Sequence, residues 1–249
     1  MNFKKGFLLV SFLIFTISCD ITENVVKVLE ENQPLTESEV VQGLKEALRV
    51  STDTAVNIVS ALNGYYGDQA IKILMPPEAG IIVDNMNNPM LRALGVNKLI
   101  DDVVIRMNRA AEDAAKTATP IFVNAIKNMT IQDAFQILNG PDTAATQYFR
   151  KKTYLQLKSG FKPKIKSSLN KPLVGNISAD KAWSSLTSAY NGVAKYVPEW
   201  KQVNTQLDEY VTNKALNGLF AKLGEQEKEI RTDPVARVTE ILRKVFGKK

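Results

Sequence analysis

The sequence predicts an all-α fold, a single multi-helix domain with short connections over residues 36–249. Apolar residues recur at intervals of three and four through most of this region, which is the period of one helix face. Ser, Thr, Asp or Pro stands before many of these stretches, and Gly or Asn often follows them, as at helix starts and ends. Hydrophobic residues make up 45% of the 249 residues and charged residues 23%, so the chain can bury a sizeable core.

The first predicted helix begins at Thr36 and ends at the Asn63-Gly64 pair. Thr36 and Glu39 have the spacing of a capping box, and an apolar stripe follows them. Residues 65–77 lack helical spacing and are flanked by glycines and by two prolines. We therefore expect a short irregular or extended segment over 65–77.

Four helical stretches are predicted in the middle of the chain. A helix resumes after Pro77 and is disturbed near Asn88-Pro89. The next spans 96–118 and is rich in alanine, which allows neighbouring helices to approach closely. A proline opens the helix predicted over 120–128, and a Thr and an Asp three residues apart cap the one over 130–139.

The C-terminal part predicts further helices separated by prolines. A long helix starts at 142 and reaches 157, and two prolines interrupt the segment 161–173. Helices follow over 178–198 and 207–230. An Asp-Pro pair, suited to an N-cap and a first helical position, opens the last helix at 233–247.

Residues 1–18 predict a lipoprotein signal peptide. Lys4 and Lys5 supply the positive start, and the apolar stretch after them is too short to span a bilayer and is followed by polar residues. Cys19, the only cysteine, stands at the cleavage position, so we expect acyl chains on it and an acidic spacer over 19–35. A plain secretory leader is the alternative. The expected location is the bacterial cell envelope, anchored to the membrane and facing the periplasm.

The composition excludes several kinds of chemistry. The chain has no histidine, which removes Ser-His and Cys-His catalysis and His-ligated zinc. With Cys19 acylated, no thiol is left for a disulfide or a nucleophile. No glycine-rich phosphate loop, nucleophile elbow or calcium loop is present in the sequence. We therefore expect no cofactor, no metal and no enzymatic activity.

Three sets of polar residues, each spaced for one helix face, are the candidates for a polar site. Their simpler interpretations are a solvated face for the first set, N-capping by Asp142 in the second, and core packing of Tyr210 in the third. The candidate residues are Asn108, Arg109, Glu112, Asp142, Thr146, Arg150, Tyr210 and Lys214.

Charge is unevenly distributed, although Lys and Arg exceed Asp and Glu only by 32 to 26. Residues 143–179 contain eight basic residues and no acidic one. On a lipid-anchored protein such a stretch suits anionic headgroups; the alternatives are a solvated face or pairing with the acidic segment 20–46. The candidate membrane-surface residues are Lys151, Lys152, Lys158, Lys162, Lys164 and Lys166. An exported protein rarely meets nucleic acid, so none is expected as a partner.

Several short segments along the chain form a set that is similar to a known family. They are Gly43–Leu48, Arg92–Gly95, Met107–Glu112, Ala144–Arg150, Tyr210–Leu216, Ile230–Pro234 and Lys244–Gly247. Together they resemble an uncharacterised bacterial envelope-protein family, domain of unknown function 4197, over roughly residues 35 to 247. The resemblance implies an export or lipoprotein leader, which agrees with Cys19, and it implies no particular activity.

Three functions from different classes fit these observations. The first is a non-enzymatic envelope lipoprotein that binds a protein partner or has a structural role, for which an exposed apolar patch is expected. The second is a binding module for a lipid or other apolar ligand, for which an apolar cavity is expected. The third is a hydrolase that works with carboxylates instead of histidine, for which a polar cleft is expected. The lack of catalytic motifs favours the first.

Overall fold

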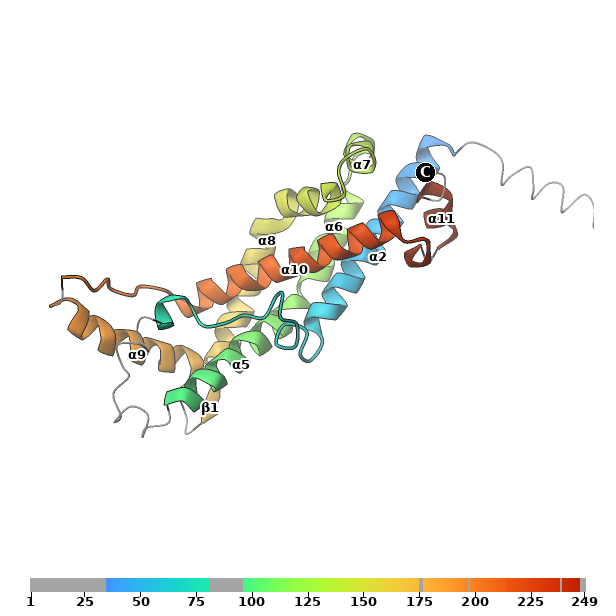
Figure 1. Ribbon diagram of the computed structural model, residues 1–249. Coiled ribbons are helices and arrows are strands. Elements are labelled where there is room, and N and C mark those ends of the chain that lie inside the picture. Colours follow the sequence, from blue (N-terminus) through green and yellow to red (C-terminus); the bar gives the residue numbers. More distant parts are fainter. Residues whose placement is uncertain (1–34, 81–95, 175–176, 197, 238, 247–249) are drawn as a thin grey trace, which may run out of the picture. The chain divides into compact units, whose positions relative to one another are not determined.

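Three long helices, α5 (Val96–Ala115), α8 (Ala144–Leu169) and α10 (Leu207–Thr232), pack along one another (Figure 1). This is the arrangement in a computed structural model, which describes residues 35–80, 96–174, 177–196, 198–237 and 239–246. The chain divides into two units, residues 1–37 and 38–249, and the helices listed below belong to the second. The all-α prediction is confirmed.

The core lies where α8 meets α5 and α10. Every fourth residue of α8 is fully or almost fully buried: Phe149, Thr153, Leu157, Phe161, Ile165 and Leu169. Alanines of α5 face this stripe, and their small side chains allow close approach of the helices. Phe122 belongs to a fourth helix, α6 (Ala118–Lys127). Its ring contacts those of Phe149 and Phe220 edge-on, with centroids 5.1 Å and 6.3 Å apart. These contacts join α6 to α8 and α10.

The helix α8 is longer than predicted, because it continues through Pro163 where an interruption was expected. A proline in a helix interior costs about 3 kcal/mol. Phe161, Ile165 and Leu169 lie on either side of it with no exposed surface, and burying each such side chain stabilises the fold by about 1.5–3 kcal/mol. Burial therefore outweighs the local penalty, and Pro163 itself is exposed.

Short connections join α8 to the following elements. Strands β1 (Pro172–Val174) and β2 (Ile177–Ser178) form an antiparallel pair that was not predicted. The helix α9 (Ala179–Ala194) follows, and the Ser178 hydroxyl accepts a hydrogen bond from the Lys181 N–H at 3.2 Å, as predicted for an N-cap.

Two further predictions of helix starts have different outcomes. At α7 (Ile131–Leu138) the capping box of Thr130 and Asp133 is confirmed, with both reciprocal hydrogen bonds present. The predicted last helix is instead divided into a 3₁₀ turn, η1 (Pro234–Ala236), and α11 (Glu240–Phe246).

The helix α11 packs against α2 (Glu37–Ser60) at a glycine. A Cβ atom built on Gly43 would lie 2.5 Å from Cγ2 of Val245 and 3.1 Å from Cγ1 of Ile241, so a side chain at this position would require Val245 to shift. The leader, Cys19, the spacer up to residue 34 and the segment around Asn88-Pro89 lie outside the described residues.

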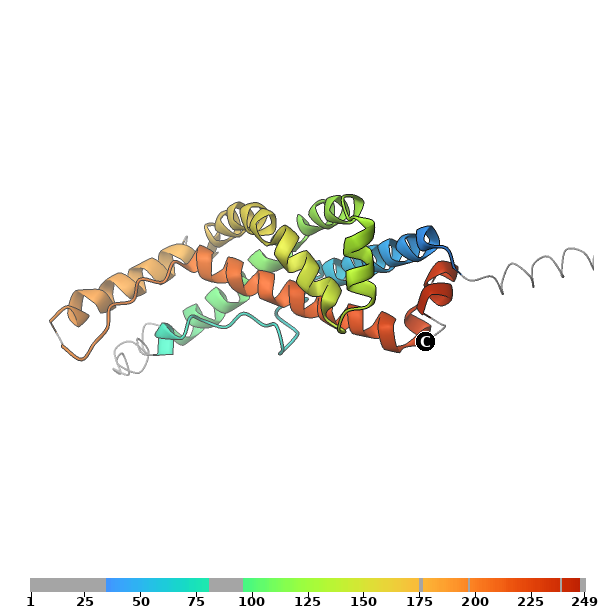
Figure 2. The ribbon, with the colours of Figure 1, turned by 90° about the horizontal axis from the view of Figure 1, so that it is seen from above.

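Residues 61–77 form an irregular segment of turns and extended chain, in agreement with the prediction for 65–77. The segment runs beside α5 and α10, as both views of the ribbon show (Figures 1 and 2). Its Tyr65, Ile71 and Ile73 side chains are buried in the core, and its polar contacts involve several of the predicted site residues.

Candidate functional site

Asn108 of α5 binds the main chain of the irregular segment. Its side chain accepts a hydrogen bond from the Ile73 N–H at 2.9 Å and donates one to the Ile73 carbonyl at 2.8 Å, so it pairs with this residue as a neighbouring strand would. The same amide donates to the Val104 carbonyl at 2.8 Å. Asn108 has no exposed surface, and these hydrogen bonds satisfy the polar atoms of its buried amide.

Glu112, one turn further along α5, binds the start of the same segment. Its Oε1 accepts hydrogen bonds from the N–H groups of Tyr65 at 3.2 Å and Tyr66 at 3.4 Å. Its Oε2 forms an ion pair with Arg109, which also donates to Oδ1 of Asn63 at 2.7 Å. Asn63 has a φ of 66°, the left-handed region that Asn tolerates better than most residues. The pair therefore stabilises the turn that ends α2.

Two tyrosines fix the segment against α10. The Tyr65 hydroxyl donates to the Ala215 carbonyl at 2.7 Å, and burial raises the pKa of this phenol, so it remains a donor. The Tyr210 hydroxyl lies 3.1 Å from the Leu74 carbonyl and 3.3 Å from that of Met75. The Lys214 ammonium lies 5.7 Å from the Tyr210 ring centroid. Tyr210 thus has a polar role in addition to the core packing that was its simpler interpretation.

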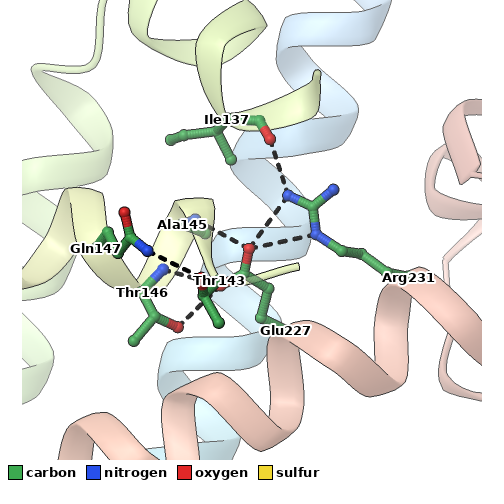
Figure 3. A network of polar contacts seen from close by, with 7 residues as sticks. All are labelled: Ile137, Thr143, Ala145, Thr146, Gln147, Glu227 and Arg231. Atoms are coloured by element: carbon green, nitrogen blue, oxygen red, sulfur yellow. Dashed lines mark hydrogen bonds and ion pairs between the residues drawn. The ribbon is translucent and has the colours of Figure 1, made fainter. Parts of the chain in front are cut away.

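A second buried carboxylate, Glu227 of α10, caps the start of α8 (Figure 3). Its Oε1 accepts from the Ala145 N–H at 2.9 Å, and its Oε2 accepts from the Thr146 N–H at 2.9 Å and the Thr146 hydroxyl at 2.8 Å. Arg231 pairs with Glu227 at 3.1 Å and donates to the Ile137 carbonyl at 2.8 Å. One ion pair therefore ties together the end of α7, the start of α8 and the C-terminal end of α10.

Asp142 does not cap α8. Its side chain is exposed, and the N-cap residue is Thr143, which makes no side-chain capping bond. Glu227 binds the first N–H groups of the helix instead, because the packing of α10 brings its carboxylate to the positive end of the helix dipole.

Arg150 also faces α10. It donates to Oδ1 of Asn217 at 3.2 Å, and its guanidinium lies 4.6 Å from the centroid of the Phe220 ring. Such a cation–π contact contributes about 0.5–1 kcal/mol at exposed sites. The residues Asp142, Thr146 and Arg150, which share one face by spacing, therefore have three different environments.

The predicted polar residues do not gather at one place. Asn108, Arg109, Glu112 and Tyr210 bind the irregular segment, and Thr146 joins the Glu227 network at the start of α8. Asn108, Glu112 and Tyr210 bind main-chain groups, whereas Arg109 and Thr146 bind side chains of the same domain, so all five shape the fold.

Sequence reasoning missed Glu227 and Arg231, which are central to the second network. A signal was present, because Glu227 falls on the buried stripe of α10 between Leu223 and Ile230. An acidic residue in such a stripe is rarely fully buried unless it is paired, and Arg231 stands four residues later.

The six lysines predicted to face a membrane divide into two groups. Lys158 and Lys162 form ion pairs with Glu209 of α10, and their hydrogen bonds lower the pKa of that carboxyl to about 2. The other four have exposed side chains: Lys151, Lys152, Lys164 and Lys166.

An apolar pocket of about 180 Å³ opens between α5, α9 and β2. Ser185, at its rim, is the one polar lining residue. The others are Met75, Ile100, Val103, Ile177, Ala182, Trp183 and Leu186. A second, polar hollow of about 390 Å³ lies beside it, where α9 and the start of α10 meet the end of α8.

Within the described residues, no three acidic or cysteine side chains gather so as to hold a metal ion. Every described helix is too short or too polar to span a bilayer.

The family described as "Protein of unknown function (DUF4197)" matches residues 34–247, which is most of the chain. No curated protein matches the sequence, and no solved structure does.

Proposed function

The chain belongs to the DUF4197 family of proteins of unknown function, and we propose that it is an exported, lipid-anchored protein of the bacterial cell envelope that binds a partner without catalysing a reaction. The leader of residues 1–18 and Cys19 at its end support the anchoring and the periplasmic orientation. The proposed location rests on the sequence, whereas the proposed role of the helical domain rests on the contacts of its polar groups.

The proposal of a non-enzymatic role rests on the hydrogen bonds and ion pairs of the two buried carboxylates. Glu112 and Glu227 each accept hydrogen bonds from main-chain N–H groups and each pair with an arginine. A general acid or base must reach the proton that it transfers, and a nucleophile must reach its substrate. Carboxylates that stabilise the fold in this way favour a binding role over the hydrolase alternative.

Fractionation of native cells tests the anchor. The wild-type protein is expected in the membrane fraction with the mass of an acylated chain beginning at Cys19, because acyl chains hold a protein stably on a bilayer. Cys19→Ala is expected to abolish that mass, whereas Ser18→Ala keeps a small residue at the junction and is expected to be processed normally. A soluble, unacylated wild-type protein in untreated cells would contradict the proposal.

A second candidate function is the binding of an apolar ligand, and the pocket beside Trp183 favours it. Its volume of about 180 Å³ is too small for a whole drug-sized molecule, but it suits the end of an alkyl chain or one ring. Partial burial of such a group in a largely apolar lining would be driven by the hydrophobic effect.

Native and denaturing mass spectra of the protein from its own envelope fraction test this function. A bound apolar ligand is expected as extra mass that is lost on denaturation. Ser185→Phe, at the rim of the apolar pocket, is expected to remove that mass, whereas Ser184→Phe, one residue away in the polar hollow, is expected to keep it. Identical masses under both conditions would contradict the binding of an apolar ligand and leave partner binding as the proposed function.

A further inference from the structure

The outer surface of α8 combines positive charge with exposed apolar side chains. The helix contains seven basic residues and no acidic one. One shallow hollow is lined by residues of α8 alone: Leu155, Lys158, Ser159, Lys162, Pro163 and Lys166. We refer to the surface from Lys151 to Lys166 as the α8 outer face.

The charge of the α8 outer face is only partly neutralised within the domain. Glu209 balances one of the two charges of Lys158 and Lys162, with which it pairs. The hydrogen bonds that Thr130 donates in the α7 capping box are the main cause that lowers the pKa of Asp133, and the nearby charges of Lys152 and Lys151 lower it further. Asp180 and Asp208 share the polar hollow with Lys166. An excess of positive charge therefore remains.

Leu155 lies among these lysines with 79% of its surface exposed. Its neighbours on the same face include Lys151, four residues before it, and Ser159, four residues after it. Exposed single leucines are common on protein surfaces. Leu155, however, has Lys151, Lys152 and Lys158 three or four residues away along the helix, so an apolar side chain lies among lysine stems that can reach outward.

We propose that the α8 outer face docks the helical domain against the anionic headgroups of the membrane that holds its acyl anchor. The proposal rests on the proposed function, because the anchor supplies the high local concentration of lipid. Charge complementarity identifies the occupant: anionic headgroups attract clustered lysines, and Leu155 can enter the interface between them. An acidic protein partner is the alternative occupant, and the experiment separates the two.

The test is covalent labelling of lysines in the full acylated protein, purified and reconstituted into vesicles. One set of vesicles is an equimolar mixture of phosphatidylglycerol and phosphatidylethanolamine, and the other is phosphatidylcholine alone. Acetylation is measured at each lysine by mass spectrometry. We expect labelling of Lys151, Lys152, Lys164 and Lys166 to be at least about fivefold slower on the anionic vesicles, and high salt to reverse most of this difference.

Exposed lysines outside α8 are the internal control. Lys116, Lys127, Lys201 and Lys228 are exposed and lie on other parts of the domain. Their labelling is expected to be the same on both kinds of vesicle. Equal protection of these lysines and those of α8 would overturn the proposal, since it would mean that no particular face meets the membrane.

Two variants with the same loss of charge sharpen the comparison. Lys158 and Lys162 line the same face and are also expected to be protected on anionic vesicles. Replacement of the four exposed α8 lysines by glutamine is expected to remove that protection. Replacement of the four control lysines by glutamine is expected to leave it unchanged. Leu155→Gln is expected to reduce the protection that remains at high salt. Salt screens the electrostatic contribution of the lysines but not the apolar contribution of Leu155.

The outcomes separate this proposal from the one on which it rests. A protein that does not float with either kind of vesicle lacks the anchor, and the proposed function fails. A protein that floats with both but labels identically on both keeps the anchor and overturns the docking face. Protection that arises only on adding envelope proteins to phosphatidylcholine vesicles would identify an acidic protein as the occupant instead, and would likewise overturn the proposal.

Discussion

Glu227→Ala is expected to lower the free energy of unfolding by about 3–5 kcal/mol, because it removes one partner of a buried ion pair. The side chains of Glu227 and Arg231 are only 6% and 11% exposed. Without the carboxylate, the Arg231 charge stays largely buried, and the N–H groups of Ala145 and Thr146 lose their acceptor at the start of α8. Urea denaturation followed by far-ultraviolet circular dichroism measures the change.

Glu225→Ala is the matched control in the same helix. Glu225 pairs with Lys222, but its side chain is 51% exposed, and exposed pairs contribute about 0–1 kcal/mol. Glu227→Gln keeps an acceptor while losing the charge, so we expect an effect between those of the two alanine variants. If Glu227→Ala were no more destabilising than Glu225→Ala, the network would not be the point that joins α7, α8 and α10.

Gly218→Ala is expected to destabilise the protein by about 1–3 kcal/mol, although alanine is the better helix former. A Cβ on this residue of α10 would lie 2.7 Å from Cε1 of Tyr65 and 3.2 Å from Cβ of Ile71. Tyr65 is fully buried and bonded to the Ala215 carbonyl, so its ring cannot move aside without losing that bond. Thermal or urea unfolding measures the loss.

Gly224→Ala, six residues along the same helix, is expected to have the opposite sign. The nearest atom to a Cβ there is the Thr146 hydroxyl oxygen at 3.7 Å, an ordinary contact, so the substitution should stabilise by about 0.5–1 kcal/mol. Tyr65→Leu combined with Gly218→Ala should be less destabilising than the sum of the two single changes, because the leucine leaves room for the new methyl group. Stabilisation by Gly218→Ala would refute the close contact between α10 and the Tyr65 ring.

Local signals predicted those elements whose boundaries depend on local chemistry. The capping box of Thr130 and Asp133 involves residues three apart, so it is visible in the sequence, and it is present in the structure. The same holds for the start of α9 at Ser178. The predicted interruption at Pro163 was wrong because the penalty for this proline is local, whereas the burial that outweighs it comes from α5 and α10.

The candidate polar residues show a similar division. Spacing alone marked Asn108, Arg109 and Glu112 as unusual neighbours on one turn of helix. The partners of Asn108 and Glu112, however, are main-chain groups of Tyr65, Tyr66 and Ile73, about 35 to 47 positions away in the chain. Main-chain N–H and carbonyl groups are the same in every residue, so no sequence pattern identifies which of them a side chain will bind.

The sequence by itself determined the helical class, the family and the exclusion of histidine chemistry, because these follow from periodicity, short motifs and composition. Only the tertiary structure decided that Glu227 caps α8 in place of Asp142, and that Glu209 pairs with two of the α8 lysines while four others face solvent. The physical reason is that capping and charge pairing act over a few ångströms in space, and the packing of α10 against α8 brings together residues that lie far apart in the chain.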